Sequence, residues 1–145
     1  MLTRFPGKVD HLVSLGCKGA PLPEGWENIS PEDKLRLVFD DVNTPENAYG
    51  LWDAPTKLDV LKLLRFIRER SPQGHWLFHC RMGISRSSAC AIVMLAAVFP
   101  NHPPKEILKE VVKARPQADP NRLILAHADE ILGYGGSLVN VARSH

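Results

Sequence analysis

The chain has 145 residues, of which 44% are hydrophobic, so it is long enough for one hydrophobic core and too short for two domains. Its 18 basic and 16 acidic residues leave a formal net charge of +2, far from the basic density of nucleic-acid-binding proteins. We therefore expect a single domain over residues 1–145 and no nucleic-acid partner.

Cysteine usage and apolar runs bear on where such a chain operates. The three cysteines are odd in number and lack paired spacing, which argues against a disulfide framework and favours a reducing compartment. Residues 1–7 lack the apolar segment of a signal peptide, and no apolar run reaches the ~20 residues that cross a bilayer. We expect a cytoplasmic monomer with no membrane partner.

Three short apolar runs predict buried strands, because each is bounded by turn formers or polar residues. They are His11–Leu15, Leu35–Phe39 and His75–Phe78. Between the first two, residues 17–31 are rich in glycine and proline and predict an irregular surface segment. Nothing in the sequence places Cys17, in this segment, near another cysteine, although a redox partnership with Cys80 is conceivable.

Helical spacing of apolar residues predicts the remaining elements. Residues 57–70 form an amphipathic helix that Asp53 or Thr56 can cap, and its basic residues suit a solvated face. Further helices are expected over 89–99, 105–114 and from 120 to 133, with a short or frayed one in 137–145. This alternation predicts an α/β fold: a mainly parallel central sheet with helices on both faces and a site at its carboxyl end.

The segment His79–Ser88 joins the third strand to the apolar helix Ala89–Phe99. A loop wound around a helix N-terminus directs free N–H groups and the positive end of the helix dipole at one point, which favours anions. Cys80 beside that point should have its thiol pKa lowered from ~8.5 into the range ~3.5–7.5. Gly83 permits the tight backbone path that the loop requires.

Arg86 begins the following helix and can fold its planar guanidinium over the same anion. Its two parallel donors match two oxygens of a phosphate, which a lysine cannot do. The side chains of the other loop residues matter less than their backbone N–H groups. The expected phosphate-binding residues are Arg81, Met82, Gly83, Ile84, Ser85 and Arg86.

His79-Cys80, five further residues, Arg86 and Ser87 resemble the signature of the cysteine-dependent protein tyrosine phosphatases. The Gly-Ile-Ser-Arg-Ser ending is most similar to the compact dual-specificity branch. Outside the loop, Phe39-Asp40-Asp41-Val42 and Pro120-Asn121-Arg122 resemble segments of small bacterial tyrosine-phosphatase-like proteins. The resemblance extends from His11 to about Arg143.

The resemblance implies a hydrolase that removes phosphate from phosphotyrosine through a cysteinyl-phosphate, and it leaves open whether phosphoserine and phosphothreonine are substrates too. Cys80 would be the nucleophile, Arg86 would bind the phosphate, and Ser87 would donate to the departing thiolate, although Ser87 can equally cap the helix. His79 is expected behind the cradle, where its ring would fix the loop and tune Cys80.

The general acid is expected at the carboxyl end of the second strand, where Asp40 and Asp41 stand. Strand alternation ties Asp40 to the strand end and leaves Asp41 free to lean over the pocket. The family pattern also places the acid at Asp41, with Glu46 and Asp53 as the next candidates. In the same loop Tyr49 and Trp52 either pack against the body or contact a substrate ring.

Other functions stay open at this point. A rhodanese-type sulfurtransferase also uses a cysteine in an anion loop, but its loops do not usually show this pattern. A phosphatase for inositol phosphates would be expected to carry loop lysines, which are absent here. A phosphoprotein-binding pseudo-phosphatase would keep the cradle without turnover. The six histidines show no metal-ligand spacing, so we expect no metal and no cofactor, and a phosphorylated protein or small phosphomonoester as the only partner.

Overall fold

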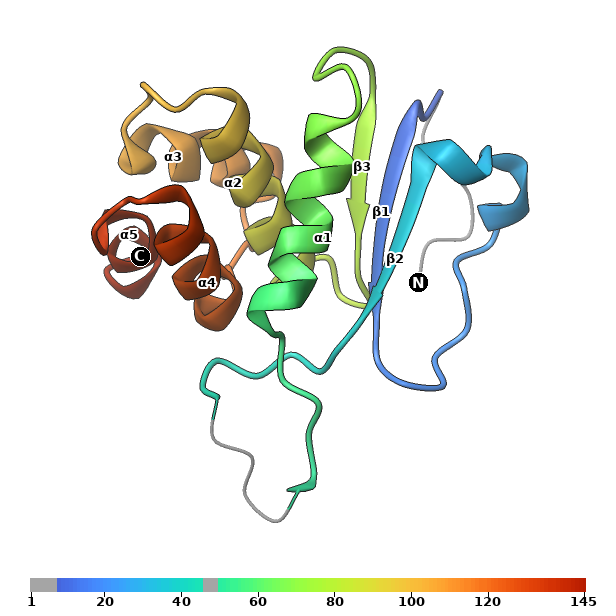
Figure 1. The fold of residues 1–145 in the computed structure, drawn as a ribbon, viewed down its shortest axis with the longest axis horizontal. Coiled ribbons are helices and arrows are strands. Elements are labelled where there is room, and N and C mark those ends of the chain that lie inside the picture. The colour runs from blue at the N-terminus through green and yellow to red at the C-terminus, as the bar shows by residue number, and fades with distance from the viewer. Residues whose placement is uncertain (1–7, 46–49) are drawn as a thin grey trace.

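The computed structural model describes residues 8–45 and 50–145. Its centre is a sheet of three parallel strands in the order β2-β1-β3 (Figure 1). The strands are β1 (His11–Gly16), β2 (Lys34–Val38) and β3 (Trp76–His79). Each lies within about one residue of the predicted run. In the register, Val13 of β1 lies opposite Leu35 of β2 and Phe78 of β3.

Five α-helices follow the predicted order along the chain. They are α1 (Lys57–Arg68), α2 (Arg86–Val98), α3 (Pro104–Ala114), α4 (Arg122–Leu132) and α5 (Ser137–Arg143). Two short 3-10 helices, η1 (Trp26–Asn28) and η2 (Pro31–Asp33), stand in the segment between β1 and β2. The parallel α/β architecture expected from the sequence is therefore confirmed.

Helix ends are set by capping side chains. Thr56, one of the two candidates, caps α1: its hydroxyl accepts from the Asp59 N–H, and the Asp59 carboxylate accepts from the Thr56 N–H. Asp53, the other candidate, does not cap this helix. Asn121 caps α4 by accepting from the Ile124 N–H, and Gly133 ends it with a φ of 76°.

The distribution of helices differs from the expectation of helices on both faces. The five α-helices gather on one face of the sheet (Figure 1). Crossovers between parallel strands are right-handed, and the step from β1 to β2 runs opposite to the step from β2 to β3. The two connections therefore fall on opposite faces. The connection from β2 to β3 contains α1. The connection from β1 to β2 is the segment 17–33, whose glycines and prolines allow only 3-10 turns.

The core lies between the sheet and this helical layer. Val13 and Leu15 of β1 and Leu63 and Ile92 of α1 and α2 are at most 2% exposed. Because α2 is apolar on most of its surface and buried between neighbours, its first turn is held rigidly under the β3–α2 loop. In the described part of the chain, no helix is both long and apolar enough to cross a membrane.

Candidate active site

The loop from Cys80 to Arg86 joins β3 to α2 at the carboxyl end of the sheet, as predicted. Cys80 is buried, and its Sγ lies 3.1 Å from the Ser87 Oγ. Burial raises the pKa of the Cys80 thiol, but hydrogen bonds from the Ser87 hydroxyl and from backbone N–H groups of Ser87, Gly83 and Ile84 outweigh it. The net effect lowers the pKa, which favours the thiolate.

The loop is braced from outside through its carbonyl groups. The Arg115 guanidinium donates 3.1 Å hydrogen bonds to the carbonyls of Gly83 and Met82. The backbone N–H groups of Asp119 and Asn121 donate to the carbonyls of Ile84 and Ser85, respectively. Because successive carbonyls are engaged on the outside, the N–H groups of the loop are left to face Cys80. Gly83 makes the bend with a φ of 65°.

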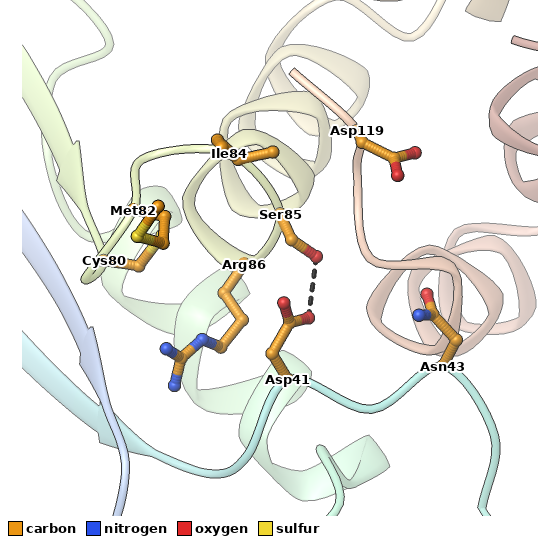
Figure 2. A pocket seen from close by; sticks show the side chains of 8 residues that line it. All are labelled: Asp41, Asn43, Cys80, Met82, Ile84, Ser85, Arg86 and Asp119. Atoms are coloured by element: carbon orange, nitrogen blue, oxygen red, sulfur yellow. Dashed lines mark hydrogen bonds between the residues drawn. The ribbon is translucent and has the colours of Figure 1, made fainter. Parts of the chain in front are cut away.

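Arg86 is buried at the start of α2, and its Nη1 donates to the Phe39 carbonyl over 2.9 Å. The same nitrogen lies 3.4 Å from the Cys17 Sγ. Within the described residues, the hydrogen bonds of this side chain start from Nη1, so Nε and Nη2 remain as a parallel donor pair. The guanidinium is thus tied to the end of β2 while it lines the pocket with Cys80 (Figure 2).

Asp41 lies beside this loop, with its carboxylate pointing toward Ser85 (Figure 2). Its Oδ1 accepts hydrogen bonds from the Ser85 hydroxyl over 2.7 Å and from the Asn121 amide over 2.8 Å. Asp40 faces elsewhere: its Oδ2 accepts from the Asp53 N–H, and its own N–H donates to the Asp53 carbonyl. The predicted division between the two aspartates matches this geometry.

These groups surround a cavity of about 250 Å³. Its lining includes Asp41, Asn43, Cys80, Met82, Ile84, Ser85, Arg86 and Asp119. Of the predicted phosphate-binding residues, Arg81 is exposed and does not line this cavity, and Gly83 contributes its backbone. Ser87 reaches Cys80 from below, and the helix cap position belongs to Ser85, so Ser87 does not act as the cap.

The structure does not give His79 the expected contact with the loop. Period-two alternation turns its side chain to the sheet face opposite the helices, at the level of Ser14. Both ring nitrogens are buried without a hydrogen-bond partner among the described residues, and burial lowers the pKa of the ring. The ring therefore lies behind the strand, and within the part of the chain that the structure describes it makes no hydrogen bond that would fix the loop.

Several contacts were missed by sequence reasoning. Ser85, expected to offer only its backbone, uses its hydroxyl on Asp41, and Cys17 contacts Arg86 across 69 positions of chain. Asn121 belonged to a recognised motif that had no assigned role. Trp52 is 44% exposed and does not line the cavity, while Tyr49 and Glu46 lie outside the described residues. Across residues 8–45 and 50–145, no group of three or more His, Cys, Asp or Glu is placed to hold a metal ion.

Solved phosphatase structures share this fold. The chain matches PTPMT1 in complex with PI(5)P at a TM-score of 0.62 and 19% identity, covering 94% of this chain and 81% of that one. It matches DUSP15 at 0.61 and 23% identity, covering 94% and 76%. The Yvh1 phosphatase domain from Chaetomium thermophilum gives 0.55 and 22%, covering 90% and 82%. No family model and no curated protein matches the sequence.

These likenesses define the class of structure. The chain has the fold of the protein tyrosine phosphatases and dual-specificity phosphatases, which confirms the fold that the loop motif implied. With identities below 25%, the comparisons show the fold alone, and the chemistry has to be derived from the site.

Proposed function

We propose that this chain is a phosphomonoester hydrolase that acts on phosphotyrosine within a single catalytic domain, through a cysteinyl-phosphate. The observation that carries the proposal is the convergence on one small cavity of three groups. They are the Cys80 thiol with its lowered pKa, the Arg86 guanidinium and the Asp41 carboxyl. A nucleophile, a phosphate clamp and a proton donor are the parts that phosphoryl transfer through a covalent intermediate requires.

In the first step the Cys80 thiolate attacks phosphorus, and an S–P bond forms as the bond to the ester oxygen breaks. Arg86 and the loop N–H groups hold the three non-bridging oxygens and stabilise their charge. The departing oxygen keeps the electron pair of the broken bond and takes a proton from the Asp41 carboxyl.

In the second step water attacks the phosphocysteine and gives its proton to the Asp41 carboxylate. The S–P electron pair returns to Cys80 as a thiolate, which the Ser87 hydroxyl stabilises at 3.1 Å. The net reaction converts one phosphomonoester and one water to one alcohol and one phosphate, and the enzyme is restored.

The cavity lining supports a substrate with one phosphate. Among the described residues that line it, Arg86 is the cation, whereas Asp41 and Asp119 are carboxylates. A second phosphate would meet negative charge at the rim. The Met82 side chain, 65% exposed at the same rim, offers an apolar and polarizable contact that suits an aromatic ring. Both features favour phosphotyrosine over inositol polyphosphates.

Phosphate release from four substrates tests the proposal: a phosphotyrosine peptide, its phosphoserine counterpart, an inositol polyphosphate and a phosphoinositide in vesicles. We expect release from the phosphotyrosine peptide, weaker release from phosphoserine, and none with Cys80→Ser. Preference for either inositol compound would overturn the substrate class. Tight phosphopeptide binding without release would instead indicate a binding module.

A further inference from the structure

The motif Pro120-Asn121-Arg122 has no part in the chemistry above, yet its middle residue lies buried beside the cavity and contacts Asp41. Asn121 is fully buried and lies where three segments meet. They are the segment after β2 that carries Asp41 (the acid loop), the segment Cys80–Arg86 (the phosphate loop) and the start of α4. We propose that Asn121 is the positioning residue for the general acid: it fixes the Asp41 carboxyl so that Oδ2 carries the transferable proton. This inference rests on the proposed function.

Every polar group of the Asn121 side chain is committed. Its Oδ1 accepts from the Ile124 N–H over 2.9 Å, so that atom must be the oxygen, and the other must be the nitrogen. Nδ2 then donates to the Asp41 Oδ1 over 2.8 Å and to the Val42 carbonyl over 2.9 Å. An amide nitrogen has two hydrogens, and both are used on the acid loop.

The backbone of Asn121 faces the other loop, because its N–H donates to the Ser85 carbonyl over 3.1 Å. Ser85 in turn donates its hydroxyl to the Asp41 Oδ1 over 2.7 Å. Asn121 and Ser85 thus form one unit that grips a single carboxylate oxygen while joining the acid loop to the phosphate loop (Figure 2 shows the Ser85 bond).

This grip has a chemical consequence. Two donors on Oδ1 occupy its lone pairs, so a proton on the carboxyl group resides on Oδ2. Among the described residues, the hydrogen bonds of Asp41 end on Oδ1, which leaves Oδ2 as the oxygen that can deliver a proton. Because Asp41 is exposed on a loop, its orientation depends on this anchor rather than on packing.

The test uses two variants at position 121. Asn121→Ser keeps an oxygen that can cap α4 but loses the amide donor, and Asn121→Ala loses both. Thr56→Ala is the matched control, because it removes the cap of α1 and touches none of the contacts of Asp41. Each variant is assayed with phenyl phosphate, whose leaving group needs a proton, and with dinitrophenyl phosphate, whose leaving group does not.

We expect Asn121→Ser to lower kcat for phenyl phosphate roughly 10- to 100-fold and to leave dinitrophenyl phosphate within about threefold, since only the poor leaving group needs the acid. Inhibition by inorganic phosphate should stay unchanged, and Thr56→Ala should not alter the ratio between substrates. In an Asp41→Asn background, Asn121→Ser should add no further selectivity, because two residues acting as a unit are not additive.

Equal losses with both substrates, or a further loss confined to phenyl phosphate in the Asp41→Asn background, would overturn the role of Asn121 while leaving the phosphatase function in place. If Asp41→Asn itself shows no selectivity for the poor leaving group, the acid assignment falls, and the role of Asn121 falls with it. Absence of turnover by the wild-type chain toward either substrate would identify failure of the proposed function itself.

Discussion

The phosphate loop and the acid loop meet at the same cavity but are built in different ways. Residues 80–86 form the floor of the cavity from one continuous stretch. Ser87, the hydrogen-bond partner of Cys80, lies only seven positions away along the chain. Asp41 is held by Ser85 and Asn121, which lie 44 and 80 positions away along the chain. The reacting groups of the phosphate loop thus come from one stretch of sequence, although tertiary contacts brace its carbonyls, whereas the acid and its partners come from three separate segments.

The difference indicates where each function is vulnerable. The nucleophile and the clamp depend on their own side chains, because the backbone of the loop is fixed by β3, by α2 and by several hydrogen bonds to its carbonyls. The acid depends on neighbours, because it stands exposed after the end of β2. Substitutions in the phosphate loop should therefore affect every substrate, whereas those around Asp41 should affect substrates according to their leaving group.

The largest effect is expected from Cys80→Ser. A serine hydroxyl has no nearby base to ionise it, so hydrolysis of every aryl phosphate should fall to background. The cradle of N–H groups and Arg86 stays intact, so vanadate should still bind. Calorimetry with vanadate and steady-state assays check both parts; activity near that of the wild type would sink the mechanism.

Arg86→Lys should have the next largest effect. The rate of aryl phosphate hydrolysis should fall ~10²–10³-fold, which corresponds to about 2.7–4 kcal/mol of transition-state stabilisation. The reason is geometric: the guanidinium holds the Phe39 carbonyl with Nη1 and still presents two donors to phosphate, which an ammonium group cannot do. The rate should fall alike for good and poor leaving groups. A loss below tenfold would mean that Arg86 supplies charge only.

Asp41→Asn should cost about 10²-fold with phenyl phosphate, the lower end of what a positioned acid contributes, since water can reach this exposed residue. Activated nitrophenyl esters should lose much less, so the rate should come to depend steeply on the leaving-group pKa. Asp40→Asn, which perturbs only the link to Asp53, should not produce that dependence. Its appearance in the Asp40 variant would reverse the assignment.

Ser87→Ala should have the smallest effect on the rate at neutral pH. Its effect should appear as a shift in the pH profile of Cys80 reactivity. The hydroxyl stabilises the thiolate and so lowers the pKa of Cys80; without it the pKa rises, and less thiolate is present at low pH. The acidic limb of alkylation by iodoacetamide should therefore move to higher pH. Ser88→Ala is the control, because the Ser88 hydroxyl donates to the carbonyls of Ile84 and Ser85 and not to Cys80; an equal movement there would contradict the assignment.

Much of the fold was predictable from periodicity, because apolar runs and helical spacing report burial directly. The strands and helices end within a few residues of their predicted limits. The face that carries the helices was not predictable in the same way. It depends on the strand order β2-β1-β3, which no local pattern encodes, and on a connection too rich in glycine and proline to form an α-helix.

The site residues also fall into two groups, those that a local motif predicts and those that depend on tertiary packing. Cys80, Arg86 and Ser87 could be predicted because one short motif contains them all. The use of the Ser85 hydroxyl and the approach of Cys17 to Arg86 could not, because they arise when segments distant in sequence pack together. His79 combines both outcomes: strand alternation turns its ring away from the cradle, as expected, but among the described residues the ring makes no hydrogen bond that would fix the loop.

If phosphate passes through Cys80, rapid acid quench during turnover should trap it on that residue. The wild-type chain is mixed with an aryl phosphate, quenched during turnover, digested and examined by mass spectrometry, with Cys80→Ser treated in parallel. We expect one added phosphoryl group on the peptide that contains Cys80, and we expect it to be absent in the variant. Turnover with the phosphoryl group on another residue, or with none on the protein at any quench time, would contradict it.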